Sequence, residues 1–184
     1  MIDLDNIEDS INEIYCKYYL DVYRFLICFS GTQNDAEDLT QEVFIRVLRN
    51  LAKYNQRTTL KTWIFSIAKH VAIDHYRRKK FVTIFKEGFF TQLVSSEKLP
   101  YELIEQQKLK ETLHQVISTL KPHFRAIIIL RGINEFTIKE TSKILRCSEA
   151  KVKVAYHRAL KDLKKKLNID VEEVVENAKG SRFV

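Results

Sequence analysis

Glycine and proline are scarce in this chain, which has four glycines and two prolines among 184 residues. A soluble protein of average composition and equal length would carry about 22 of the two together. Because Gly and Pro mark most turns, a chain with so few of them must consist of long elements, and long elements in a soluble protein are helices. This scarcity argues against a sandwich or barrel of many short strands and predicts an all-α fold. The hydrophobic content of 45% is sufficient for a packed core.

Cysteines are also few, and long apolar runs are absent. The three cysteines lie far apart, without the spacing of a zinc site. The longest apolar runs, Phe25–Phe29 and Ala126–Leu130, have five residues each, whereas a membrane helix needs about twenty. The start of the chain is acidic where a signal peptide would be basic. We therefore expect a soluble, cytoplasmic protein with reduced thiols and no membrane-inserted segment.

Catalytic signatures are absent as well. The sequence shows no pairing of nucleophile and base, no phosphate-cradling loop and no paired metal carboxylates. His70 and His75 are five residues apart, which is not the spacing of a helical metal pair. We expect no enzymatic activity, no cofactor and no metal site.

The charge is strongly segregated along the chain, whose net charge is +7. Residues 1–45 hold ten acidic and two basic residues, whereas residues 46–80 hold ten basic residues and one acidic. A second basic block, residues 143–166, has nine basic residues and two acidic. Two basic blocks favour two contacts with a polyanion. The acidic block indicates either a basic protein partner or a solvated face.

Apolar periodicity predicts three helices in the first 80 residues. The first stripe runs from Ile11 to Phe29. Asp35 can cap the second helix, whose stripe is Leu39, Val43, Phe44, Val47, Leu48 and Leu51. Residues 53–61 are predicted to form a loop, and a third stripe runs from Leu60 to Tyr76. We expect residues 1–80 to form a small helical bundle.

A linker and a second helical domain are predicted after this bundle. The pattern is lost over residues 81–102, which we interpret as the linker, and helical signals resume from Leu103. Pro122 can open a further helix. The second domain covers residues 103–168, and residues 169–184 form a tail.

The second domain contains the layout of a helix-turn-helix. Thr137 and Glu140 form a capping box at the start of a short helix that ends at Leu145. A tight turn follows, and Ser148 caps a longer helix through Leu163. Val152, Tyr156, Ala159, Leu160 and Leu163 are predicted to face inward. The other faces then carry residues that suit the major groove, namely Lys151, Lys153, Val154, His157, Arg158 and Lys161. An ordinary helical hairpin with basic solvent positions is the alternative interpretation.

Three stretches of the chain resemble bacterial RNA polymerase sigma factors of the extracytoplasmic-function (ECF) type. They are AEDLTQEVFIRVL at 36–48, TWIFSIAKHVAIDHYRRKK at 62–80 and FTIKETSKILRCSEAKVKVAYHRALKDLKKKL at 136–167. The three stretches occur in the family's order, with a linker between the second and the third. The resemblance implies a subunit that binds core RNA polymerase and recognises the −10 and −35 elements of promoter DNA.

The first stretch is similar to the segment that docks on the clamp helices of the polymerase β′ subunit. The resemblance implies a polar rim around two apolar residues, and it assigns this contact to Asp38, Leu39, Gln41, Glu42, Val43 and Arg46.

The second stretch is similar to the reader of the −10 element. In the family, a loop and the following helix hold a flipped base and track the single strand, and flipping costs a few kcal/mol that stacking and hydrogen bonds must offset. The resemblance places the loop at 54–61 and phosphate contacts at Arg77, Arg78, Lys79 and Lys80. Trp63 could serve as a stacking platform, but it lies on the apolar stripe, and we therefore expect it in the core. The residues assigned to −10 DNA are Tyr54, Lys61, Lys69, His70, Asp74, Arg77 and Arg78. Many family members have Asn at the position of His70, so the preferred base is left open.

The third stretch is similar to the reader of the −35 element. The resemblance assigns base and phosphate contacts to Lys153, Val154, His157 and Arg158, and phosphate contacts alone to Lys151 and Lys161. It also implies that helices between Leu109 and Leu130 offer an apolar face to the β flap, and that a cognate anti-sigma factor holds the protein.

These features together predict an alternative sigma factor. One alternative is a two-domain helix-turn-helix regulator that binds duplex DNA through residues 137–163 alone, and another is a helical domain that binds only proteins. A regulator has no reason to combine an acidic docking helix with a basic loop and helix suited to single strands.

Overall fold

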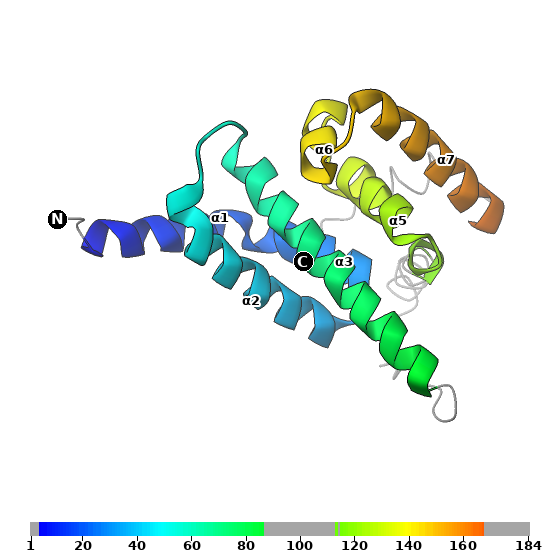
Figure 1. Cartoon of the computed structure of the whole chain (residues 1–184), viewed down its shortest axis with the longest axis horizontal. Coiled ribbons are helices and arrows are strands. Elements are labelled where there is room, and N and C mark those ends of the chain that lie inside the picture. The colour runs from blue at the N-terminus through cyan, green and yellow to red at the C-terminus, as the bar shows by residue number, and fades with distance from the viewer. Residues whose placement is uncertain (1–3, 87–112, 114, 168–184) are drawn as a thin grey trace, which may run out of the picture.

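The computed structural model of the chain describes residues 4–86, 113 and 115–167, and their regular structure is helical (Figure 1). Three helices form the N-terminal domain: α1 (Leu4–Ser30), α2 (Gln33–Asn50) and α3 (Leu60–Lys86). The short 3₁₀ turn η1 (Leu51–Lys53) follows α2. The described part of the C-terminal domain contains α5 (Pro122–Ile128), the π-helical turn η2 (Ile129–Ile133), α6 (Ile138–Leu145) and α7 (Glu149–Leu167). The all-α prediction with two small helical domains is confirmed.

The predicted apolar stripes explain how the N-terminal domain packs. Phe25 and Phe29 of α1, Val47 of α2, and Ile64 and Phe65 of α3 are buried in its core. Full burial of each such side chain contributes about 1.5–3 kcal/mol. The stripe prediction differs from the structure at Leu48, which is 41% exposed because the other side of α2 faces α1 and α3.

The start of α2 differs from the sequence prediction in its capping residue. Thr32, not Asp35, is the N-cap, and its hydroxyl accepts a hydrogen bond from the backbone N–H of Asp35. The Asp35 carboxylate accepts in turn from the Thr32 hydroxyl at 2.7 Å. Both residues therefore contribute hydrogen bonds that stabilise the first turn of α2.

Helix α3 extends beyond its apolar stripe. It continues through Lys86, so the first six residues of the predicted linker are helical. Residues 87–112, which hold the rest of that linker and the predicted helix start at Leu103, lie outside the described residues, as does the tail 169–184.

In the C-terminal domain, α7 lies across α5 and α6 (Figure 1). Ile127, Leu130, Ile144, Val152 and Leu163 fill its core. The apolar face predicted for the β flap is turned inward where it is described, because Leu113, Ile117 and Leu120 are buried. None of the helices that the structure describes is long and apolar enough to span a bilayer.

Candidate protein and nucleic-acid interfaces

The outer face of α2 carries part of the set assigned to the polymerase. Asp38 and Gln41 are exposed, whereas Glu42 and Arg46 are half-buried and form an ion pair of 2.5 Å along the helix. Leu39 and Val43 are 4% and 0% exposed, since both pack between α1 and α3. Their assignment as polymerase contacts stays a prediction, and in this structure they position the outer face from beneath.

Two apolar residues of α2 that were not assigned to the site are exposed. Ile45 is 48% and Leu48 is 41% exposed. Together with Asp38 and Gln41 they fall at i, i+3, i+7 and i+10, which places all four on one face of the helix. The face is therefore polar in its first half and apolar in its second. Helical periodicity in the sequence could have identified Ile45 as exposed, because this residue lies outside the apolar stripe that forms the buried side of α2.

The loop before α3 is held in shape by Tyr54. Its hydroxyl donates a hydrogen bond of 2.5 Å to the Thr58 carbonyl, and its ring packs on Trp63 at 5.1 Å between centroids. Gln56, between them in the chain, has a left-handed backbone with φ of 56°, a conformation that costs a residue with a side chain roughly 1–2 kcal/mol. Tyr54 and its neighbours therefore stabilise a strained loop without glycine.

Lys61 already has partners within the protein. Its ammonium group pairs with the Asp21 carboxylate of α1 at 2.6 Å and lies 5.5 Å from the centre of the Phe136 ring. The sequence assigned this lysine to −10 DNA. In this structure its charge faces α1 and the C-terminal domain, and its contact with −10 DNA stays a prediction.

Lys69, His70 and Asp74 lie within about one and a half turns of each other along the middle of α3. Lys69 is 7% exposed, and its Nζ lies 3.0 Å from Nε2 of His70. Burial, reinforced by the charge of Arg146 in the C-terminal domain, lowers the pKa of Lys69. Burial and the neighbouring Lys69 lower the pKa of His70, whereas Asp74 acts to raise both pKa values.

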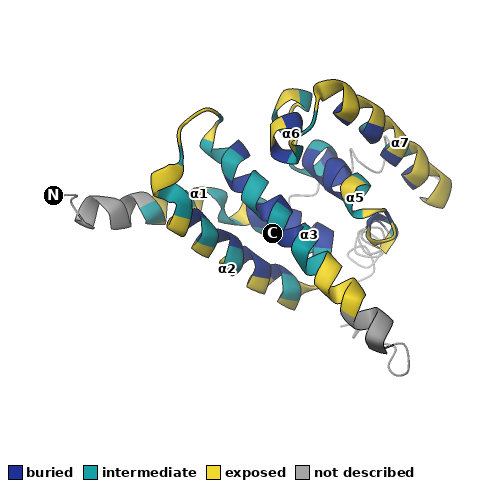
Figure 2. Ribbon diagram, viewed as in Figure 1, coloured by how far each residue is buried: buried dark blue, intermediate teal, exposed yellow. Residues whose placement is uncertain are grey.

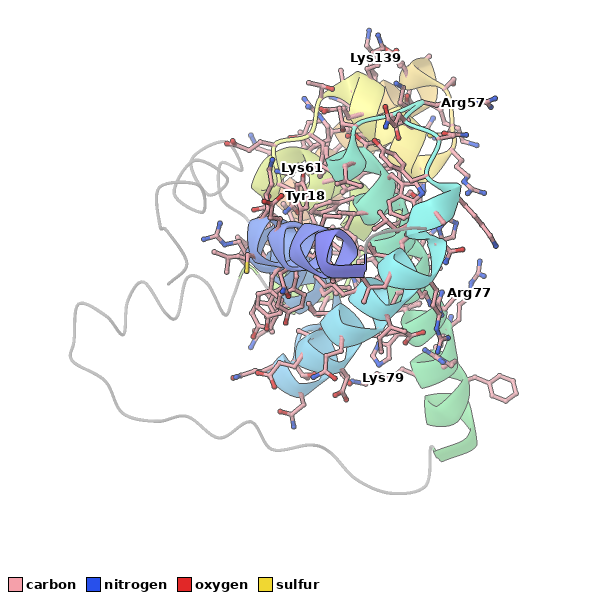
Figure 3. The ribbon with its side chains drawn as sticks, turned by 90° about the vertical axis from the view of Figure 1, so that its left-hand side faces the viewer. Tyr18, Arg57, Lys61, Arg77, Lys79 and Lys139 are labelled. Atoms are coloured by element: carbon pink, nitrogen blue, oxygen red, sulfur yellow. The ribbon has the colours of Figure 1, made fainter. Side chains whose placement is uncertain are left out.

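The end of α3 is a dense, exposed basic segment. Arg77, Arg78, Lys79 and Lys80 are all exposed, as Figure 2 shows for this end of the helix. Figure 3 places Arg57, from the loop before α3, and Arg77 along the same edge of the molecule, with Lys61 on the other side. The residues assigned to −10 DNA thus do not form one continuous exposed surface.

Ion pairs connect the acidic and basic blocks of the N-terminal domain. Asp35 lies 2.8 Å from Lys79 and 3.4 Å from His75, and Arg78 lies 3.9 Å from Glu42. Although burial acts to raise it, hydrogen bonds from Lys79 and Thr32 lower the pKa of Asp35. Part of the acidic block therefore pairs with basic residues of the same chain. The charge pattern of the sequence alone indicated only a basic protein partner or a solvated face for this block.

The helix-turn-helix forms as its local sequence predicts. The Thr137 hydroxyl accepts from the Glu140 backbone N–H, and the Glu140 carboxylate accepts from the Thr137 backbone N–H at 2.8 Å. Arg146 ends α6 in the left-handed conformation, with φ of 53°. Ser148 accepts from the Lys151 backbone N–H at 3.3 Å, as expected of an N-cap.

Helix α7 presents the complete predicted −35 set to solvent. Its inward side is formed by the five residues predicted for it and by Ala155, which the sequence interpretation did not include. Val154 is 52% exposed, which leaves its methyl groups accessible to an apolar ligand group such as a thymine methyl group. The other exposed members of the set are Lys151, Lys153, His157, Arg158 and Lys161.

Comparison with known families and proteins matches both domains. Residues 14–82 match the family model "Sigma-70 region 2", and residues 110–163 match "Sigma-70, region 4". The chain is 38% identical over 174 residues to the ECF RNA polymerase sigma factor SigX of Bacillus subtilis, covering 92% of this chain and 90% of SigX. It is 34% identical over 165 residues to the ECF RNA polymerase sigma factor SigM of the same organism, covering 89% of this chain and 99% of SigM.

A solved structure shares the fold. It is the sigma factor RpoE in complex with the anti-sigma factor NepR from Bartonella quintana, with a TM-score of 0.71 at 21% identity. The match covers 88% of this chain and 98% of that chain.

Proposed function

The chain belongs to the ECF sigma factors of the sigma-70 family and acts as an alternative sigma factor in transcription initiation, and we propose a division of this work among its helices. Helix α2 docks on core RNA polymerase, the 54–61 loop and α3 read the −10 element, and α7 reads the −35 element. The chain contributes binding and specificity in the cytoplasm, while the core enzyme supplies the catalysis. We retain residues 1–80 and 103–168 as its functional domains.

The observation that carries this proposal is the separation of two chemically different exposed faces. The α2 face combines Asp38 and Gln41 with the apolar Ile45 and Leu48. Such a mixture suits a protein partner, because apolar area supplies affinity and the charged rim supplies orientation. The α7 face is basic and lies at the start of a recognition helix, which suits duplex DNA.

Run-off transcription with purified core RNA polymerase on a promoter library tests the function itself. We expect promoter-specific initiation that depends on the added chain. A chain that binds duplex DNA but never supports specific initiation would instead be a helix-turn-helix regulator.

Charge reversal on α2 tests the docking face. We expect Asp38→Lys to weaken binding to core polymerase, measured by fluorescence anisotropy, because it places a cation in the acidic half of the face. Glu37→Lys makes the same change on the adjacent exposed position and serves as the matched control. Equal loss in both variants would assign the effect to overall charge and contradict docking through this face.

Regulation by an anti-sigma factor is also proposed for this chain. The fold match is to a sigma factor solved with such a partner. Affinity purification of the tagged chain from its native cells should recover a protein that competes with core polymerase for it. Recovery of core polymerase alone, under every growth condition tried, would contradict this part of the proposal.

A further inference from the structure

The two domains pack against each other in this structure. Helix α3 contacts α5 and α6, and α1 contacts η2 (Figure 1). Phe136, just before α6, is 3% exposed, and its ring meets Phe65 of α3 edge-on at 4.6 Å between centroids. The side-chain amide of Asn134 donates a hydrogen bond of 3.1 Å to the backbone carbonyl of Asp21 in α1. The interface thus combines aromatic packing with a specific polar contact.

Arg125 of α5 forms the most constrained contact between the domains. It is 4% exposed, and its Nη1 donates a hydrogen bond of 2.7 Å to the carbonyl of Phe29 in α1. Its guanidinium carbon lies 5.2 Å from the ring centre of Phe29 and 5.2 Å from that of Tyr76 in α3. The cation is therefore placed between two aromatic rings of the other domain, an arrangement that favours a desolvated guanidinium.

This cation depends on the closed interface for compensation. Among the described residues no carboxylate pairs with Arg125, and its Nε has no hydrogen-bond partner. Its remaining bonds go to the carbonyls of Ser118 and Leu120 in its own domain. A buried charge without a counter-ion is costly unless hydrogen bonds and aromatic faces replace water. Phe29 and Tyr76 supply that replacement only while the domains are together.

The closed interface also covers groups assigned to −10 DNA. Lys69 is buried, and Arg146 and Cys147 of the helix-turn-helix are near enough to act on its charge. Lys61 is engaged by Asp21 and Phe136. A DNA phosphate cannot reach Lys69 in this arrangement. Because Lys69 and Arg146 carry like charges, their proximity opposes closure, and a contact of opposite effect must hold the domains together.

We infer that the free chain is held in a closed arrangement by an aromatic clasp, in which Arg125 inserts between Phe29 and Tyr76, and that release of this clasp uncovers Lys69. The functional consequence, a −10 surface that is inaccessible until the domains separate, rests on the proposed function of α3. The clasp itself does not.

The reactivity of Lys69 toward an amine-acetylating reagent, followed by mass spectrometry of the full chain, tests the clasp. Lys151 and Lys153 are exposed and provide internal references. In the wild-type chain we expect Lys69 to react at least about tenfold more slowly than these references. Arg125→Leu should raise its rate roughly tenfold, because one hydrogen bond from a charged group shifts an equilibrium by at least that factor.

Two further variants separate the clasp from general instability. Tyr76→Leu removes one wall of the clasp from the N-terminal side, leaves the bonds of Arg125 within its own domain intact, and should unmask Lys69 as well. Leu163→Ala is the control for general instability, since it removes a fully buried side chain of α7, a helix that packs on α5 and α6 of its own domain. Circular dichroism melting confirms that each variant is folded.

Several outcomes decide the matter. If Lys69 in the wild-type chain reacts as fast as Lys153, or if Leu163→Ala unmasks it as much as Arg125→Leu, the clasp is overturned. Binding of a mixed-sequence single-stranded oligonucleotide reports separately on the −10 role. Unmasking of Lys69 without a gain in oligonucleotide binding would support the clasp and contradict the −10 assignment.

Discussion

At the scale of single residues, the reciprocal pair of Thr137 and Glu140 determines where the helix-turn-helix begins. Each satisfies a backbone N–H that the first turn of α6 leaves without a helical partner. Burial acts to raise the pKa of Glu140, but the hydrogen bonds from Thr137 outweigh it and the pKa is lowered. The carboxylate form is therefore favoured by folding.

We predict that Thr137→Ala lowers the free energy of unfolding by about 1 kcal/mol at pH 7. Because the folded-state pKa of Glu140 is depressed, its stabilisation is complete above the unfolded value of about 4.3 and is lost as the pH falls through the lower folded value. Urea unfolding at pH 7 and at acidic pH measures both effects. Ser148→Ala, at the next helix start, is the control for loss of a cap without a capping box. A penalty for Thr137→Ala that did not shrink in acid would contradict the contribution of Glu140.

At the scale of single elements, α2 separates a buried side from an exposed side that both contain apolar residues. Leu39 and Val43 hold the helix against α1 and α3, whereas Ile45 and Leu48 face solvent. Neighbouring residues of similar hydrophobicity therefore serve stability on one side and partner binding on the other.

Paired substitutions on α2 should separate these two roles. Ile45→Asp should change the free energy of unfolding by less than about 0.5 kcal/mol, while weakening binding to core polymerase through loss of apolar contact area. Val43→Ala should cost roughly 2 kcal/mol of stability, because it leaves a cavity in the core. Thermal melting and an anisotropy titration with core polymerase measure the two quantities. Normal polymerase binding by a folded Ile45→Asp variant would remove Ile45 from the docking face.

Helix α7 permits a second test at this scale, because its lysines differ in position but not in charge. If Lys153 neutralises a phosphate, Lys153→Ala should reduce the slope of log affinity against log salt concentration by about one. Lys165→Ala, about three turns further along the helix, removes the same charge and should leave the slope nearly unchanged. Filter binding to duplex −35 DNA over a range of salt concentrations gives both slopes. Equal slopes for the Lys153→Ala variant and the wild-type chain would show that Lys153 does not neutralise a phosphate of the DNA backbone.

At the scale of the whole molecule, the packed interface couples the stability of two domains that the sequence separates by a linker. The contact between Phe65 and Phe136 joins the core of one domain to the start of the helix-turn-helix in the other. Truncation of a buried Phe costs about 3–5 kcal/mol, and here part of that cost lies in the coupling of the domains.

We therefore predict that Phe136→Ala separates the unfolding of the two domains. Differential scanning calorimetry should show one main transition for the wild-type chain and two for the variant, with the C-terminal domain melting first. Ile144→Ala removes a fully buried side chain from the same domain without a ring contact to α3, and should lower stability while keeping the transitions joined. A single transition for Phe136→Ala would show that coupling runs through other contacts.

What the sequence determined by itself is the set of features that depend on near neighbours. Few Gly and Pro residues predicted helices, apolar spacing predicted which side of each helix is buried, and Thr137 and Ser148 predicted where α6 and α7 begin. Neither the 54–61 loop nor the turn between α6 and α7 contains Gly, and local contacts explain how both turns form without it. Gln56 and Arg146 adopt left-handed backbones there. Side-chain hydrogen bonds of Tyr54 and Asn55 support the first turn, and backbone hydrogen bonds to α6 support the second.

Only the tertiary structure decided which of the predicted contact residues are accessible. Lys69 is covered by the helix-turn-helix, Lys61 is paired with Asp21, and Arg125 bonds the Phe29 carbonyl 96 positions away in the chain. Exposure depends on what packs against a residue from distant segments. Periodicity and capping act over a few residues, so they define a helix and its faces but not which of those faces another domain will cover.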